Sequence, residues 1–226
     1  MTDDIKIEEY KNLVLRREAI NKEALAIQVK YIKAFGELIV KEYNLEIKCI
    51  KLKKTIAYCQ SRKNRGQSVV RAQLDEYLES VLSEYYAELD DIVAVKNSKS
   101  EKLSEIERYK IKKLYRKLAT MIHPDLHPRL FEKEDIAKYW NRICNAYNRN
   151  DYKDLQALEV LVVEAMKNYG EKEVKIDVEN VEEKIAQIKR EIAGIENNDP
   201  YRLKEFLRNK EAVEEKKEEF RKSIEE

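Results

Sequence analysis

Glycine and proline are scarce in this chain, and their scarcity narrows the choice of fold. The 226 residues include four glycines and three prolines, whereas Asp, Glu, Lys and Arg make up 39%. Few turn-forming residues and many charged ones disfavour turn-rich sheets and favour long, solvated helices. A chain of this length can bury a core in one large domain or in two small ones. We therefore expect an all-α protein.

Long apolar runs and an excess of one charge are also missing. No run approaches the roughly 18 apolar residues of a membrane span, and the opening Met-Thr-Asp-Asp-Ile-Lys lacks the basic and then apolar order of a signal peptide. These features predict a soluble, cytoplasmic protein. The 45 Lys and Arg nearly cancel the 44 Asp and Glu, so any basic surface must be local.

Cysteine is rare as well. Cys49, Cys59 and Cys144 are an odd number and lack the spacing of a metal or redox motif. This usage fits reduced thiols in a reducing compartment. We expect all three to be packed as small apolar groups.

The N-terminal residues 1–96 show helical periodicity. A stripe with one basic residue, Arg17, at a seam position comprises Tyr10, Leu13, Ile20, Ala24, Ile27, Tyr31, Ala34 and Leu38. A second stripe comprises Val70, Leu74, Tyr77, Val81, Tyr85, Leu89 and Ile92. Between the two stripes, the Asn and Gly of Arg62-Lys63-Asn64-Arg65-Gly66 are typical of a helix end. The pattern predicts a long antiparallel helical hairpin.

The C-terminal residues 171–226 are predicted to form a second helical hairpin. Its apolar positions are Val181, Ile185, Ile188, Ile192 and Ile195, and then Leu203, Phe206, Val213, Phe220 and Ile224. Asp199 is expected to cap the second of these helices, with Pro200 at its first position. Each narrow apolar face needs a partner. The hairpins could pack on each other, on the central region, or across the axis of a homodimer.

The central residues 97–170 carry the most informative pattern. On a helix, one face collects the four cations Lys112, Lys113, Arg116 and Lys117, while apolar residues lie on the other sides. Pro124 lacks an N–H and ends this helix at His123. Asp125 then presents a carboxylate on an exposed loop. Such a surface offers charge-assisted hydrogen bonds to a protein partner.

This region resembles the J domain of the DnaJ family. The family's basic helix is matched by Tyr115-Arg116-Lys117-Leu118-Ala119, its loop by His123-Pro124-Asp125, and its third helix by Trp140, Ile143, Ala146 and Tyr147. The resemblance covers residues 100–158. It implies two antiparallel helices joined by the loop, with a core of Tyr115, Leu118, Trp140, Ile143 and Tyr147.

The resemblance also implies a function. The loop residues His123, Pro124 and Asp125, together with Lys112, Lys113, Arg116 and Lys117, would dock onto a DnaK-type 70-kilodalton heat-shock chaperone and stimulate its ATP hydrolysis. The helical arms would then serve targeting or assembly. A J domain has no catalytic site, so we expect neither an enzyme nor a cofactor.

The chain departs from the family in two respects. The family's first helix is not recognisable between Ser83 and Tyr109, so Leu103 and Ile106 could extend the basic helix backward, and Tyr85–Val93 could supply the missing packing surface. The Gly/Phe-rich and Cys-x-x-Cys segments of a full DnaJ, which bind clients, are also absent.

Other interpretations of the motif are weaker. Pro124 breaks the helix that would align His123 and His127 as metal ligands. A His–Asp acid–base enzyme lacks a nucleophile and a Gly-rich loop. Nucleic acid on the basic face, beside aromatic residues such as Tyr109 and Tyr139, is disfavoured by the near-zero net charge. One alternative stays open: a structural or adaptor protein in which the J-like unit only packs the hairpins together.

Overall fold

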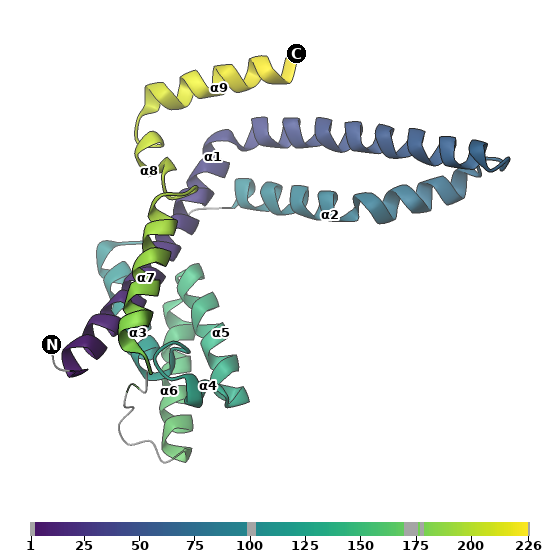
Figure 1. The fold of residues 1–226 in the computed structure, drawn as a ribbon. Coiled ribbons are helices and arrows are strands. Elements are labelled where there is room, and N and C mark those ends of the chain that lie inside the picture. The colour runs from purple at the N-terminus through teal and green to yellow at the C-terminus, as the bar shows by residue number, and fades with distance from the viewer. Residues whose placement is uncertain (1–2, 99–102, 170–175, 177–178, 226) are drawn as a thin grey trace. The chain divides into compact units, whose positions relative to one another are not determined.

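The chain is all-α in the computed structural model, which describes residues 3–98, 103–169, 176 and 179–225. These residues form nine helices and no strand (Figure 1). The helices are α1 (Asp3–Asn64), α2 (Arg71–Asn97), α3 (Glu105–Ile122), α4 (Pro128–Phe131), α5 (Glu134–Arg149), α6 (Tyr152–Asn168), α7 (Val181–Glu196), α8 (Leu203–Phe206) and α9 (Lys210–Glu225). No helix in these ranges is long and apolar enough to cross a membrane. The boundary predicted at Gly170 lies outside the described residues.

Two compact units divide the chain. The first unit contains residues 1–24 and 100–199, and the second contains residues 25–99 and 200–226. Helix α1 therefore contributes its beginning to one unit and its remainder to the other. These units do not follow the predicted ranges 1–96, 97–170 and 171–226, because packing groups segments that are distant in sequence.

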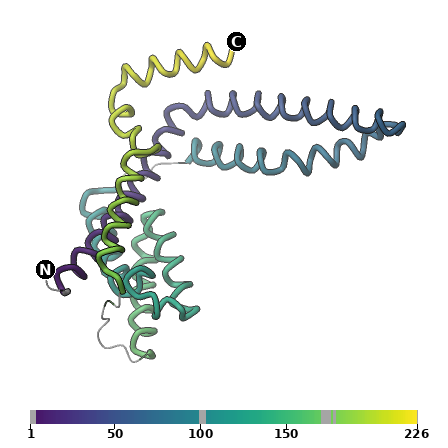
Figure 2. The backbone as a smooth tube through the Cα atoms, in the orientation of Figure 1, coloured from purple at the N-terminus to yellow at the C-terminus, as the bar shows by residue number. Residues whose placement is uncertain are grey.

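The end of α1 follows from its sequence. Gly66 has a φ of 67°, in the left-handed region that glycine adopts without strain. The Gly66 N–H donates to the Lys63 carbonyl over 3.0 Å and the Gln67 N–H to the Arg62 carbonyl over 2.9 Å. These two bonds are the Schellman arrangement that satisfies the last carbonyls of a helix. The predicted helix end is confirmed, and α2 follows after a short turn (Figure 2).

The second unit has small cores. Leu74, Leu78 and Leu82 of α2 are buried, and Ile50, Tyr58 and Tyr77 pack against them. A separate cluster joins Phe35 and Leu38 of α1 to Val213 of α9. Because the seam of the α1–α2 hairpin is narrow, Cys49 is exposed, and the prediction that all three cysteines are packed is wrong for this one.

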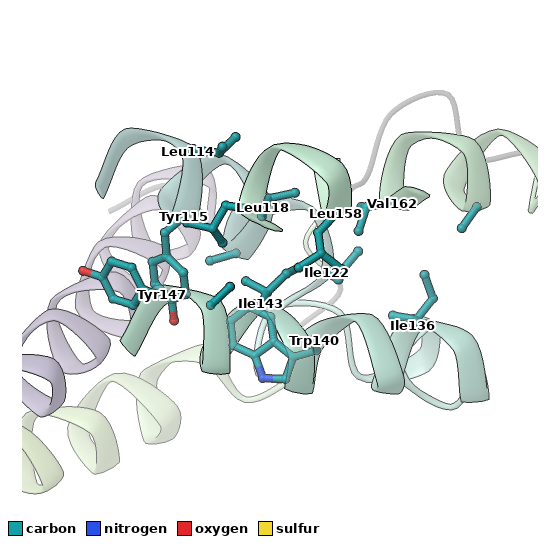
Figure 3. Packing of buried hydrophobic residues seen from close by; sticks show 14 of the residues in the cluster. Leu114, Tyr115, Leu118, Ile122, Ile136, Trp140, Ile143, Tyr147, Leu158 and Val162 are labelled. Carbon is teal, nitrogen blue, oxygen red and sulfur yellow. The ribbon is translucent and has the colours of Figure 1, made fainter. Parts of the chain in front are cut away.

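The first unit has a wider core (Figure 3). Helices α3, α5 and α6 contribute most of its 18 buried residues, and the predicted core residues Tyr115, Leu118, Trp140, Ile143 and Tyr147 are all among them. The rings of Tyr115 and Tyr147 stack at 3.7 Å, and those of His123 and Trp140 meet edge to face at 4.6 Å. The earlier residue of α3, Tyr115, contacts the later residue of α5, Tyr147, and His123 after α3 contacts the earlier Trp140. The two helices therefore run antiparallel.

The beginning of α1 also joins this core. Leu15 is one of the 18 buried residues, whereas the predicted substitute, Tyr85–Val93, belongs to the second unit. That prediction is wrong because the added helix comes from a segment much earlier in the sequence. Leu103 does pack against the core, but Ile106 is exposed, and α3 begins only at Glu105.

The C-terminal residues differ from the predicted hairpin. Helix α7 belongs to the first unit, and α8 and α9 belong to the second. Asp199 and Pro200 lie in turns before α8, whose N-cap is Arg202, so the predicted cap is wrong. The helical pattern is interrupted again before α9, where Asn209 Oδ1 accepts hydrogen bonds from two backbone N–H groups. This local capping separates the predicted single helix into two.

Candidate functional site

Helix α3 positions the predicted basic face. Ser104 caps its first turn, with its hydroxyl accepting from the Glu107 N–H and its own N–H bonding the Glu107 carboxylate at 2.8 Å. The side chains of Lys112, Lys113, Arg116 and Lys117 are exposed, whereas Ile111, Leu114, Tyr115 and Leu118 are buried. Lys117 forms an ion pair with Glu159 of α6 at 2.7 Å. The predicted separation of a packed side and a cationic side is therefore confirmed.

The His123-Pro124-Asp125 loop begins where α3 ends. His123 is the C-cap, and its N–H donates to the Ala119 carbonyl over 2.9 Å. The His123 carbonyl in turn accepts from the Leu126 and His127 N–H groups at 3.0 and 2.9 Å. These bonds close a tight turn directly after the helix, so the loop has a defined backbone.

The imidazole of His123 lies inside this turn and is only 2% exposed. Its Nδ1 accepts a hydrogen bond of 3.0 Å from the Asp125 N–H, which requires a ring without a proton on that nitrogen. Trp140 packs against the ring. The structure thus makes His123 a support for the loop, and the more accessible atoms of the motif belong to Pro124 and Asp125.

The second histidine of the region has a comparable supporting place. His127 is 4% exposed, and its Nε2 lies 2.7 Å from the Thr120 carbonyl. This contact ties the end of the loop back to the last turn of α3. Across the described ranges, no group of three or more His, Cys, Asp or Glu side chains is arranged to hold a metal ion.

Asp125 is engaged by a cation from α1. Its Oδ2 accepts a hydrogen bond of 2.7 Å from Arg17 Nη2. The same guanidinium donates to Glu191 of α7 at 2.9 Å and to Glu18 at 3.0 Å. One arginine therefore bridges three carboxylates, and the α1 and α7 helices meet at the loop.

The electrostatics of this cluster favour its charged forms. Burial lowers the pKa of Arg17, but its hydrogen bonds and proximity to Glu191 and Asp125 outweigh burial and raise it. The hydrogen bond from Arg17 lowers the pKa of Glu191. Burial alone would raise the pKa of Glu18, yet His123 and Arg17 bring it below the usual value. His123 Nε2 lies 3.8 Å from Glu18 Oε1, so the histidine borders the same cluster.

Tyr10 completes the contact from α1. Its hydroxyl donates to the Asp125 carbonyl over 3.3 Å. Burial, followed by the charge of Asp125, raises the pKa of Tyr10 to about 12. A tyrosine is neutral at physiological pH even at its ordinary pKa, and the raised pKa keeps Tyr10 a hydrogen-bond donor to the loop at more alkaline pH.

The predicted residues and the observed site overlap in part. The loop and the cationic face of α3 were found from sequence, whereas Glu18 and Glu191 were missed. One signal was present, because Arg17 is the charged exception in an otherwise apolar stripe. Its partners could not be identified, since Asp125 and Glu191 are separated from it by 108 and 174 positions.

No protein-family model, curated protein or solved structure matches the chain. The motif and the geometry around it are therefore what the chain offers toward a function.

Proposed function

We propose that the protein is a J-domain co-chaperone that docks onto a DnaK-type 70-kilodalton heat-shock chaperone and stimulates its ATP hydrolysis. The observation that carries the proposal is the exposed cationic face of α3, which runs directly into an ordered His-Pro-Asp loop. Lys112, Lys113 and Arg116 face solvent, and Asp125 is the third residue after the end of α3 at Ile122. A cationic face beside a carboxylate suits an interface with complementary charge.

The buried imidazole supports this proposal in a specific way. Because His123 Nδ1 holds the Asp125 N–H, the ring fixes where the carboxylate is presented. Replacing the ring would shift the loop without touching the cationic face. The motif can therefore act as one unit, with His123 as the positioning residue and Asp125 as the contact.

The proposal is tested by single-turnover ATP hydrolysis with the DnaK of the host. We expect acceleration by the wild-type protein, and His123→Gln should abolish it because the loop loses its internal acceptor and its packing on Trp140. Circular dichroism would show whether the variant retains its helices. No stimulation at saturating wild-type protein would refute the proposal.

Charge reversal tests the basic face separately. Lys113→Glu with Arg116→Glu should raise the concentration needed for half-maximal stimulation by about tenfold or more, since rim charges mainly govern encounter. Lys51→Glu with Lys54→Glu is the matched control, because these exposed lysines lie on the α1–α2 hairpin. Equal effects of the two pairs would argue against docking through α3.

A second candidate function is a structural adaptor in which the loop only packs helices together. The Arg17–Asp125 contact favours it, because the loop carboxylate already has an internal partner. In this case His123→Gln and Asp125→Asn would leave partner capture from host lysate unchanged. Charges placed at Ile188 or Leu207 would disrupt capture, since Ile188 is buried in the first unit and Leu207 packs against the Phe35 cluster of the second.

A further inference from the structure

The carboxylate that the proposed function would offer to a chaperone is already bound inside the chain. We propose that Arg17 is an intramolecular competitor for this docking contact, and that α7 keeps Arg17 in place, so that the His-Pro-Asp loop is held in a closed state. This inference rests on the proposed function, since it concerns the regulation of the same site. It is carried by the contacts among α1, the loop and α7.

The Asp125 carboxylate is already bound by a cation. A guanidinium is the cation best suited to bind a carboxylate, because its N–H groups match the two oxygens. Arg17 contacts one of these oxygens, Oδ2, at 2.7 Å, with a side chain only 18% exposed. A guanidinium from a partner protein that bound both carboxylate oxygens would compete with Arg17 for Oδ2. The internal ion pair therefore weakens docking through this carboxylate.

Helix α7 contacts both Arg17 and other residues near the beginning of α1. Glu191 holds the other terminal nitrogen of the Arg17 guanidinium at 2.9 Å. Three further ion pairs join α7 or its flanks to α1: Lys6–Glu182, Lys189–Glu9 and Arg16–Glu196. Ile188 of α7, Pro124 and Asp125 line a common cavity of about 280 Å³ with Tyr10 and Arg17. Helix α7 thus covers the loop on the side where Asp125 lies.

The ion pairs between α1 and α7 are weak enough for α7 to move away from the loop. Exposed ion pairs each contribute little to stability and are screened by salt. Three of the four pairs between α1 and α7 have an exposed partner, with Glu182 76%, Arg16 60% and Lys189 56% exposed, whereas the Arg17 side chain of the fourth is 18% exposed. The cluster also contains three carboxylates around one guanidinium, so loss of Arg17 would leave Glu18, Asp125 and Glu191 to repel one another. Arg17 is therefore the cation that neutralises this cluster, while α7 is also held by its other ion pairs and by the buried Ile185, Ile188 and Ile192.

The placement of Arg17 also argues against a purely structural role. It stands in an apolar stripe where an aliphatic residue would pack without the cost of desolvating a charge. The neighbouring stripe positions Tyr10, Ile20 and Ala24 are buried. An arginine that reaches out of this stripe to the docking carboxylate is best explained by that contact.

The test is Arg17→Gln in the full-length protein, assayed with the host's DnaK in single-turnover ATP hydrolysis. If the open form is about a tenth of the wild-type population, the variant should reach half-maximal stimulation at about tenfold lower concentration. Arg16→Gln is the matched control, because Arg16 also pairs with α7, at Glu196, but does not touch the loop. Adding Asp125→Asn to Arg17→Gln should remove the gain.

Hydrogen exchange supplies a second measurement. The Leu126 and His127 N–H groups bond within the loop and should exchange faster in Arg17→Gln, whereas Arg16→Gln should leave them unchanged. If Arg17→Gln fails to fold, Arg17→Lys keeps a cation among the three carboxylates but cannot bridge them as a guanidinium does. A smaller gain of the same sign is then expected.

The outcomes separate this inference from the proposed function. The competitor role would be overturned if folded Arg17→Gln and Arg17→Lys stimulate no more strongly than the wild type does. The proposed function would then stay intact. Absence of stimulation by the wild type and by both variants would overturn the proposed function itself. An equal gain from Arg16→Gln would overturn the assignment to Arg17, because any loosening of α7 would then suffice.

Discussion

The first unit and the α1–α2 hairpin are both helical and highly charged, yet they differ in whether their cores bury polar side chains. The first unit packs helices on several sides of one core and buries His123 and His127. The hairpin has two helices and a single seam, where three leucines are buried. Two helices can bury only one row of side chains between them. Additional helices cover the flanks of that row and exclude water from it. Only the wider core can hold an ordered polar loop.

Charge is distributed differently as well. In the hairpin, residues 47–71 carry eight Lys and Arg without an Asp or Glu, and residues 72–95 carry seven Asp and Glu without a Lys or Arg. In the first unit, opposite charges converge on Arg17. A net charge of +1 therefore conceals two arrangements, one segregated and one paired. Overall charge excludes little about local surfaces.

Core truncation should show the largest contrast between the regions. Ile143→Ala, at a fully buried position of the first unit, should lower the free energy of unfolding by about 2–5 kcal/mol. Leu82→Ala in the hairpin seam should cost about 2 kcal/mol, at the low end of this range, because a two-helix seam can close around the missing atoms. Urea unfolding would be followed by the fluorescence of Trp140, the single tryptophan, and by circular dichroism. Leu52→Ala is the exposed control, expected within about 0.5 kcal/mol.

Helix capping should give a smaller effect of opposite sign in the two regions. Ser104→Ala removes the capping box of α3 and should destabilise the first unit by about 1 kcal/mol. The N-cap of α2 is Val70, which makes no side-chain cap hydrogen bond, so Val70→Ser should stabilise the hairpin by about 0.5–1 kcal/mol. Hydrogen exchange in the first turn of each helix would measure both. A stabilised α3 or a destabilised α2 would contradict this assignment.

The smallest predicted effect is a pH dependence confined to the first unit. Burial lowers the pKa of Lys22 to about 8, although its ammonium donates to the Tyr147 carbonyl over 2.5 Å. Between about pH 8 and the ordinary lysine pKa, the unfolded chain keeps a proton on Lys22 that the folded chain has lost. The free energy of unfolding should therefore rise with pH in that range. We expect a gain of about 0.5 kcal/mol between about pH 7 and 8.5. Lys22→Met should remove it.

A control separates this titration from others. Lys30→Met replaces an exposed lysine of α1 in the second unit and should keep the wild-type slope. The window stops at about pH 8.5 because burial raises the pKa of the Cys144 thiol to about 12, and the proton that the folded chain then retains reverses the slope above the ordinary thiol pKa. Tyr10, with a pKa also raised to about 12, adds to this reversal at higher pH. A flat wild-type profile between the two limits would show that Lys22 keeps its charge at no cost.

Local features of the fold could be predicted from sequence because each depends on neighbouring residues. The end of α1 before Gly66 follows from glycine's conformational freedom, and the core positions of Tyr115 and Trp140 follow from helical spacing. Asp199 shows the limit of such reasoning. It has the chemistry of an N-cap, but the chain turns there and α8 begins four residues later.

The sequence by itself determined the helices, the apolar faces and the position of the His-Pro-Asp loop at the end of a basic helix. Only the tertiary structure decided that α1 supplies a helix to the central core, that α7 and α9 pack in different units, and that Arg17 binds Asp125. Helical periodicity specifies which face of a helix is buried and leaves open which helix covers it. Apolar contacts are not directional, so the choice among many similar stripes is made by the whole packed chain.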